Sequence, residues 1–212
     1  MEIGIIDYGA GNLKSVENAL WRLGLSWRIY STGSQLDALP ADGLILPGVG
    51  AFGDAMRQLE KRGFCQILRA HAVAGRPLLG ICLGLQLLFE YSEESPGVRG
   101  LGIFQGGFRR FPSDLGLKVP HIGWNRLDII KKEGIFRRAP SDMYAYFVHS
   151  FYLDAQDRSI VAATTQYGVP VDAAVERGNI SACQFHPEKS GEDGLRILRS
   201  FAEICASAKK GG

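Results

Sequence analysis

The chain has 212 residues, of which 46% are hydrophobic and 22% charged, a composition typical of a folded globular protein. At this length we expect one compact domain over residues 1–212, with a core that needs no disulfide or metal. The net charge of +2, from 24 basic and 22 acidic residues, indicates neither a nucleic-acid nor a membrane partner. Because the N-terminus has no basic leader and the four cysteines form no C-x-x-C pair, we expect a cytoplasmic protein without a metal site.

The first half of the chain alternates short apolar runs with amphipathic stretches. The apolar runs are typical of parallel strands buried on both faces, and the amphipathic stretches of helices that end at glycine. We expect strands at 2–7, 26–31, 42–47 and 77–82, and helices from Leu13 to Gly24, through Met56 and Leu59 to Gly63, from Phe64 to Gly75, and over 83–94. This alternation predicts a doubly wound α/β fold with a mostly parallel sheet, helices on both faces, and functional groups at the carboxyl ends of the strands.

The second half changes character from about Gly97 to Phe185. Its short alternating segments resemble additional antiparallel strands more than further strand and helix units. These segments are GIFQGGFRRF, MYAYFVHSFY, SIVAATTQY, VDAAVE and NISACQF. A final helix is expected over 192–209, where apolar residues recur at helical spacing.

One glycine cluster, GVGAFG (48–53), matches the G-x-G-x-x-G pattern of dinucleotide-binding proteins. That pattern needs an acidic residue about 20 positions later, at the end of the next strand. Here Leu68 to Val73 falls in a predicted helix and contains no acid. We therefore expect no nicotinamide or flavin cofactor, and interpret the cluster either as a small anion-binding nest or as a plain turn.

A second cluster, GICLG (80–84), follows an apolar strand and opens a helix, the context of a nucleophile elbow with cysteine in place of serine. The two glycines relieve crowding at the sharp turn, and the positive end of the helix favours the thiolate of Cys82. The alternative is a small buried cysteine, which we expect for Cys65, Cys183 and Cys205.

A cysteine nucleophile needs a base, and the base needs an orienting group. Of the four histidines, we expect His71 and His121 to be structural, while His149 is a candidate for the wall of a site. Only His186 has an acid close by, Glu188, which an extended backbone at the intervening proline would bring to its ring. The order Cys, His, Glu predicts a triad and disfavours a simple α/β-hydrolase, in which the acid precedes the histidine.

These two motifs, GICLGLQLL and QFHPEKS, resemble those of the class I, triad-type glutamine amidotransferases, and the resemblance runs from about residue 2 to residue 205. DYGAGNLKSVENAL, LPGVGAFGDAM, VPHIGWN and YFVHSFY are similar to the branch that serves histidine biosynthesis. That branch also carries PGVG (47–50) where many members have Pro-Gly-Gly. The resemblance implies a glutaminase that hydrolyses L-glutamine to glutamate and ammonia through a thioester on Cys82, without a cofactor.

The resemblance also implies roles for positions that the residues alone do not single out. The backbone N–H of Leu83 and one from the turn of Val49 and Gly50 are expected to form the oxyanion hole. By resemblance, this turn points the wrong way until a partner and its ligand bind. The positions that match glutamine-binding residues of the family are Gly48, Gln86, Ser150 and Phe151.

The implied partner is a (β/α)8-barrel cyclase that forms a heterodimer with the chain and uses the ammonia. We expect its contacts at Asn12, Trp124 and Lys189, with Trp124 as the anchor unless this ring lies in the core. One alternative is a glutaminase for another amidation, such as one in surface-glycan synthesis. Another is a stand-alone thiol hydrolase of γ-glutamyl bonds or peptides. An intact triad disfavours a non-catalytic interaction module.

Overall fold

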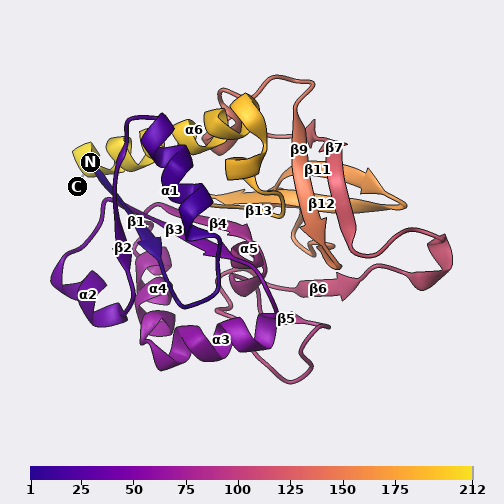
Figure 1. Cartoon of the computed structure of the whole chain (residues 1–212), viewed down its shortest axis with the longest axis horizontal. Helices are drawn as coiled ribbons and strands as arrows, with labels where there is room; N and C mark the ends of the chain where they lie inside the picture. The colour runs from indigo at the N-terminus through magenta and orange to yellow at the C-terminus, as the bar shows by residue number, and fades with distance from the viewer. Residues whose placement is uncertain (212) are drawn as a thin grey trace.

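The computed structural model describes residues 1–211 and has at its centre a twisted sheet with helices on both faces (Figure 1). Eight strands form this sheet in the order β2-β1-β3-β4-β13-β12-β11-β8. Their bounds are β1 Glu2–Ile6, β2 Ser26–Tyr30, β3 Gly43–Gly48, β4 Leu78–Cys82, β8 Asp128–Ile129, β11 Val161–Tyr167, β12 Val169–Arg177 and β13 Ile180–Cys183. The first five strands in this order are parallel, and β12, β11 and β8 continue the sheet antiparallel.

Helices cover both faces of the sheet, as the doubly wound prediction requires. One face carries α1 (Leu13–Arg22) and α6 (Gly191–Gly211). The other carries α2 (Gly33–Ala38), α3 (Phe52–Lys61), α4 (Phe64–Val73) and α5 (Leu83–Leu87). Successive residues of β3 supply the two cores in turn, with Ile45 on the α1 side and Leu44 and Leu46 on the other. Each such buried side chain contributes about 1.5–3 kcal/mol. None of the helices within residues 1–211 combines the length and apolar character that a membrane crossing requires.

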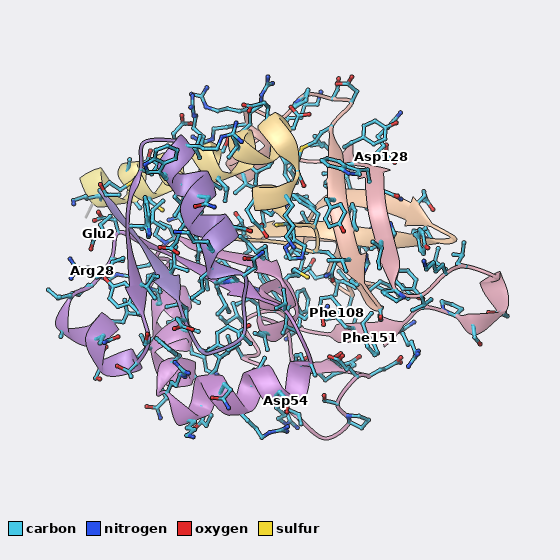
Figure 2. The ribbon with its side chains drawn as sticks, in the orientation of Figure 1. Glu2, Arg28, Asp54, Phe108, Asp128 and Phe151 are labelled. Atoms are coloured by element: carbon cyan, nitrogen blue, oxygen red, sulfur yellow. The ribbon has the colours of Figure 1, made fainter. Side chains whose placement is uncertain are left out.

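Two smaller sheets occupy the end of the molecule near β11 and β12. One has the order β10-β6-β5, and the other pairs β7 with β9 antiparallel. Phe108 and Phe151, labelled in Figure 2, lie on the neighbouring strands β6 and β10. The bounds are β5 Tyr91–Ser92, β6 Gly107–Arg110, β7 His121–Arg126, β9 Tyr144–His149 and β10 Phe151–Leu153, with short 3₁₀ turns η1 Ser113–Leu115, η2 Gly134–Phe136, η3 Arg158–Ile160 and η4 Pro187–Lys189.

The prediction of a helix over 83–94 is wrong, because α5 ends at Leu87. The carbonyl groups of Leu87 and Leu88 accept hydrogen bonds at 2.8 Å from the backbone N–H groups of Leu101 and Ile103, which takes them out of a helical pattern. Phe89 is fully buried against two further aromatic rings. Contacts distant in sequence therefore override the local helical pattern.

Two other features differ from the sequence prediction. Helix α2 was not predicted, although Thr32 and Gln35 form the capping box that marks its start. The segment NISACQF was expected to be antiparallel, but β13 is antiparallel only to β12 and runs parallel to β4. MYAYFVHSFY is divided at Ser150 into β9 and β10, which belong to different sheets.

Candidate active site

Cys82 lies at a sharp turn between β4 and α5. Its φ of 54° is the one positive value among non-glycine residues in the described part of the chain. Two glycines make this turn possible. A Cβ on Gly84 would overlap the carbonyl oxygen of Leu46, and one on Gly80 would lie 2.9 Å from the carbonyl oxygen of Gly84. The turn thus has the strained geometry expected of a nucleophile elbow.

The sheet order brings the other candidate groups to this turn. In β3, Gly48 is the register partner of Cys82, and in β13, Cys183 is the register partner of Ile81. His186 follows β13 by three residues. Parallel neighbours end at the same edge of a sheet, so a residue that follows Cys183 in the chain lies beside Cys82 although 104 positions separate Cys82 and His186 in sequence.

His186 and Glu188 are in direct contact. The Nδ1 atom of His186 lies 2.7 Å from Oε1 of Glu188, and both side chains are 2% exposed. The contact was expected from an extended backbone, and this reason is wrong, because Pro187–Lys189 forms the 3₁₀ turn η4. The turn brings Glu188 back to the ring, and Ser190 fixes it by donating a hydrogen bond of 2.6 Å to the carbonyl of His186.

The environment of His186 favours its protonated form. Burial alone disfavours the imidazolium, but interaction with Cys82 and the hydrogen bond to Glu188 outweigh burial and raise the pKa of His186 to about 9. Because Nδ1 donates to Glu188, Nε2 is the atom available to the Cys82 side. Nε2 makes no regular hydrogen bond within the described residues. The thiol instead has weak contacts with the Val148 carbonyl oxygen at 3.9 Å and the Gln184 amide nitrogen at 3.7 Å.

Cys82 and His186 open into one cavity of about 280 Å³, which we name the Cys82 pocket. This volume is near the lower end for small-molecule sites, which span about 300–1,000 Å³. A larger hollow of about 430 Å³ between α2 and α4 contains none of the candidate catalytic groups. The residues that line the Cys82 pocket are Val49, Gly50, Cys82, Leu83, Gln86, Glu94, Pro120, Val148, His149, Ser150, Phe151 and His186.

Most predicted site residues therefore lie around one pocket. Gly48 does not line it, because it closes β3 beneath the turn, where an added Cβ would meet the Tyr8 hydroxyl and the Leu83 side chain. Glu188 lies behind His186. Gln86 is buried, and its amide donates to Gln184 Oε1 at 3.3 Å, which links it to the amide group beside the Cys82 sulfur.

The turn expected to form part of the oxyanion hole stands at the pocket edge. Val49 is 39% exposed, and Gly50 has a φ of +97°. A Cβ on Gly50 would meet nothing within 4 Å, so the space on that side of the residue is open. The positive φ is a conformation that favours glycine.

Sequence reasoning missed Glu94, Pro120 and Val148 in the pocket wall. Glu94 was placed in the wrong helix prediction, so no signal pointed to it. Its Oε2 accepts a hydrogen bond of 2.7 Å from the backbone N–H of Phe52, just after the oxyanion turn. His149 was a candidate from sequence and does line the pocket.

The three expected partner contacts lie on neighbouring elements. The helix that follows Asn12, α1, contacts η4, which holds Lys189, and η4 also contacts β9, the strand paired with the β7 strand of Trp124. Asn12 is exposed and also caps the N-terminus of α1, where its side chain accepts a hydrogen bond of 3.3 Å from the Ser15 backbone N–H. Trp124 on β7 is 54% exposed, so the alternative of a core tryptophan is wrong. Lys189 in η4 is half-buried.

Comparison with known proteins agrees with this architecture. A structure described as a crystal structure of glutamine amidotransferase superposes with a TM-score of 0.75 at 20% identity, covering 96% of this chain and 98% of the other. PurLQS from Thermotoga maritima gives a TM-score of 0.74 at 20% identity, covering 95% of this chain and 97% of the other. At these identities the likeness concerns the fold alone.

The sequence carries the assignment further. The chain belongs to the glutamine amidotransferase class-I family, which it matches over residues 4–205. Its curated relatives include proteins named imidazole glycerol phosphate synthase subunit HisH. The one from Desulfitobacterium hafniense is 48% identical over 95% of this chain and 93% of its own length. Those from Moorella thermoacetica and Methanothermobacter thermautotrophicus are 46% and 50% identical, covering 99% and 95% of this chain and 98% of each relative.

Proposed function

We propose that this chain, acting as a single domain, is the glutaminase subunit of an imidazole glycerol phosphate synthase. The observation that carries the proposal is the strained turn at Cys82, which shares one pocket with His186, the ring that is hydrogen-bonded to Glu188 behind it. Near full-length similarity to HisH subunits supports the particular synthase. The substrate is L-glutamine, and the products are glutamate and ammonia.

The reaction is an acyl transfer to sulfur. The Cys82 thiolate attacks the amide carbon of glutamine, a C–S bond forms, and the carbonyl electron pair moves to oxygen. When this intermediate collapses, the C–N bond breaks and protonated His186 gives its proton to the departing nitrogen, which leaves as ammonia. His186, now neutral, removes a proton from water, which attacks the thioester and releases glutamate. A pKa of about 9 keeps His186 charged at neutral pH, as the first transfer requires.

Glu188 fixes the orientation of the imidazole. Its carboxylate can only accept a hydrogen bond, so Nδ1 carries the proton and Nε2 faces the reaction. The developing oxyanion meets the backbone N–H of Leu83 and one from the turn of Val49 and Gly50. Since the loss of one such donor lowers kcat by about 100- to 1,000-fold, rotation of this turn is an effective switch. The open space on one side of Gly50 supports such a rotation.

The partner we propose is a (β/α)8-barrel cyclase that receives the ammonia. It would dock over the two-stranded sheet of β7 and β9, where Ile122, Trp124 and Tyr144 are each more than half exposed. Asn12 and Lys189 complete this contact. A large exposed aromatic side chain suits an interface anchor, and Trp124 also packs edge-on against Tyr146, with ring centroids 6.0 Å apart.

Ammonia release from glutamine tests the proposal, measured for the chain alone and with the cyclase from the same genome and its nucleotide substrate. We expect weak activity alone, a strong increase with the partner and nucleotide, and none in Cys82→Ser. High activity that ignores the partner would instead favour a stand-alone thiol hydrolase. Activation by a different amidating enzyme, and not by the cyclase, would favour the paralogous glutaminase.

A further inference from the structure

Two buried histidines in the wall of the Cys82 pocket have no part in the acyl transfer. His121 on β7 and His149 on β9 are register partners in the two-stranded sheet and are 1% and 5% exposed. His149 lines the pocket, and His121 lies behind it. The Nδ1 atom of His121 is 3.0 Å from Nε2 of His149, so the two rings form a hydrogen-bonded imidazole pair.

His149 holds the part of the pocket wall where the chain passes from one sheet to another. Its Nδ1 atom lies 2.8 Å from the carbonyl oxygen of Phe151 and so spans Ser150, which separates β9 from β10. Because a carbonyl oxygen only accepts hydrogen bonds, Nδ1 of His149 carries a proton. This bond sets the backbone of two residues that line the pocket, Ser150 and Phe151.

The other end of the pair is fixed by Asn125. The Asn125 side-chain nitrogen donates a hydrogen bond of 2.8 Å to the carbonyl oxygen of Gln166 on β11. This donor leaves the Asn125 oxygen, an acceptor, facing Nε2 of His121 at 3.2 Å. Nε2 of His121 therefore also carries a proton when this bond is made.

Counting protons shows that a neutral pair is one proton short. The contacts with Phe151 and Asn125 each require an N–H, and the contact between the rings requires a third. Two neutral imidazoles have only two N–H groups, so one of the three contacts lacks its proton. The fully bonded pair holds three protons and a single positive charge.

Burial opposes this charge, and the packing of the rings determines which histidine carries it. Burial lowers the pKa of His121, and burial lowers the pKa of His149 to about 3. The His121 ring stacks on Tyr167 and Phe147, with centroids 3.8 Å and 5.0 Å away and interplanar angles of 19° and 18°. Aromatic faces attract a cation, so the additional proton rests on His121.

Given the charged groups around the pair, a bound anion is the ligand that would favour its protonation. Toward the pocket lie Cys82, Glu94 and His186, and protonated His186 itself lowers the pKa of His149. On the remaining sides are the uncharged Tyr152 and Tyr167 rings around Phe111. Arg110, whose guanidinium is 6.0 Å from the Phe151 ring centroid, lines an adjoining hollow together with Glu94, Ser150 and Phe151.

Glutamine brings an ammonium group and a carboxylate into the pocket. Glu94 is the one carboxylate in the pocket lining and complements the ammonium group. Of the two basic lining groups, His186 is already paired with Glu188, which leaves the imidazole pair for the carboxylate.

We propose that the His121–His149 pair takes up one proton from solvent when glutamine binds. The pair then carries the charge that balances the substrate carboxylate, and all the hydrogen bonds from Asn125 through both rings to the Phe151 carbonyl are made. Both histidines act as positioning residues, and the inference rests on the proposed function. Let the midpoint be the pH at which half of the pairs carry the additional proton. By linkage, each pH unit by which glutamine raises this midpoint means that the protonated pair binds glutamine ten times more tightly than the neutral pair does.

Histidine NMR on the full chain tests the proposal. A Cys82→Ser chain with ¹⁵N-labelled histidine is titrated with acid, with and without saturating glutamine. We expect glutamine to raise the His121 midpoint by about one pH unit or more, while His149 keeps its Nδ1 proton. His71→Gln is the matched control and should leave this shift unchanged, because the hydrogen bond of the His71 ring within the described residues is to the Pro77 carbonyl oxygen, away from the pocket.

Two variants of opposite effect sharpen the result. His121→Phe keeps a stacking ring but accepts no proton, so glutamine binding should weaken and proton uptake should disappear. Asn125→Asp presents a carboxylate to His121, so the pair should be protonated before glutamine arrives and bind it at least as tightly. Glutamine that shifts the amide signals of Ser150 and Phe151 but leaves the His121 midpoint unchanged would overturn this inference alone. No response at saturating glutamine would contradict the proposed function.

Discussion

The pair of His186 and Glu188 makes the stability of the fold depend on pH in a predictable way. The pKa of His186 rises from 6.5 to about 9 on folding, which corresponds to about 3 kcal/mol at 1.36 kcal/mol per unit. Because the folded value is the higher one, this contribution is fully present below pH 6.5 and is lost as the pH rises through 9. Cys82 and Glu188 both supply it, so Glu188→Gln should remove roughly half, about 1–2 kcal/mol.

Urea unfolding at pH 6 and pH 9.5 measures this contribution. Between these two values, the free energy of unfolding of Glu188→Gln should fall by about 1–2 kcal/mol less than that of the wild type. Glu192→Gln is the control, since that carboxylate is 74% exposed in its ion pair with Arg22 and should change stability by less than about 0.5 kcal/mol. If Glu188→Gln follows the wild-type pH dependence, the proposed electrostatic role of the pair is refuted.

Three further substitutions test separate parts of the structure. Gly84→Ala should destabilise the fold by about 3 kcal/mol, because the added Cβ overlaps the backbone. Gly11→Ala is the control: its Cβ lies at ordinary contact distances and should change the free energy of unfolding by about 0.5 kcal/mol. Thermal unfolding compares the two variants, and equal effects would contradict the steric explanation. Asp172→Asn should cost about 2–3 kcal/mol in urea unfolding, since the buried carboxylate accepts a hydrogen bond of 2.6 Å from Arg158, and a neutral effect would show that this bond is not stabilising. Trp124→Ala should weaken the binding of the cyclase by about 2 kcal/mol in a titration, because Trp124 is the expected interface anchor. The free energy of unfolding should change little, since this side chain is exposed. Unchanged binding would exclude Trp124 as the anchor.

Sequence reasoning was reliable where the chemistry is local. The elbow at Cys82 could be predicted because a strained turn requires glycines at fixed spacing. The contact of His186 with Glu188 was expected from a two-residue separation, although the turn that makes it is 3₁₀ and not extended. The alternation of apolar runs and amphipathic stretches predicted the doubly wound sheet, because the central strands β1, β3 and β4 are buried on both faces.

What sequence reasoning missed depends on contacts between distant segments. Helix α5 stops early because segment 101–104 captures its last carbonyl groups, and this error hid Glu94 from the predicted site. His121 was expected to be only structural, since its bond to His149 exists only once β7 and β9 pair. The exposure of Trp124 could not be decided either, because alternation along β7 shows two faces but not which one is covered.

In the proposed reaction Cys82 forms a covalent bond with the substrate. Mass spectrometry of the chain, acid-quenched during turnover of glutamine with the cyclase and its nucleotide, tests it most directly. We predict a glutamyl adduct on the peptide that contains Cys82, absent from the Cys82→Ser chain, which should release no ammonia. Ammonia release at the wild-type rate from Cys82→Ser, or rapid turnover with the adduct on another residue, would exclude Cys82 as the nucleophile.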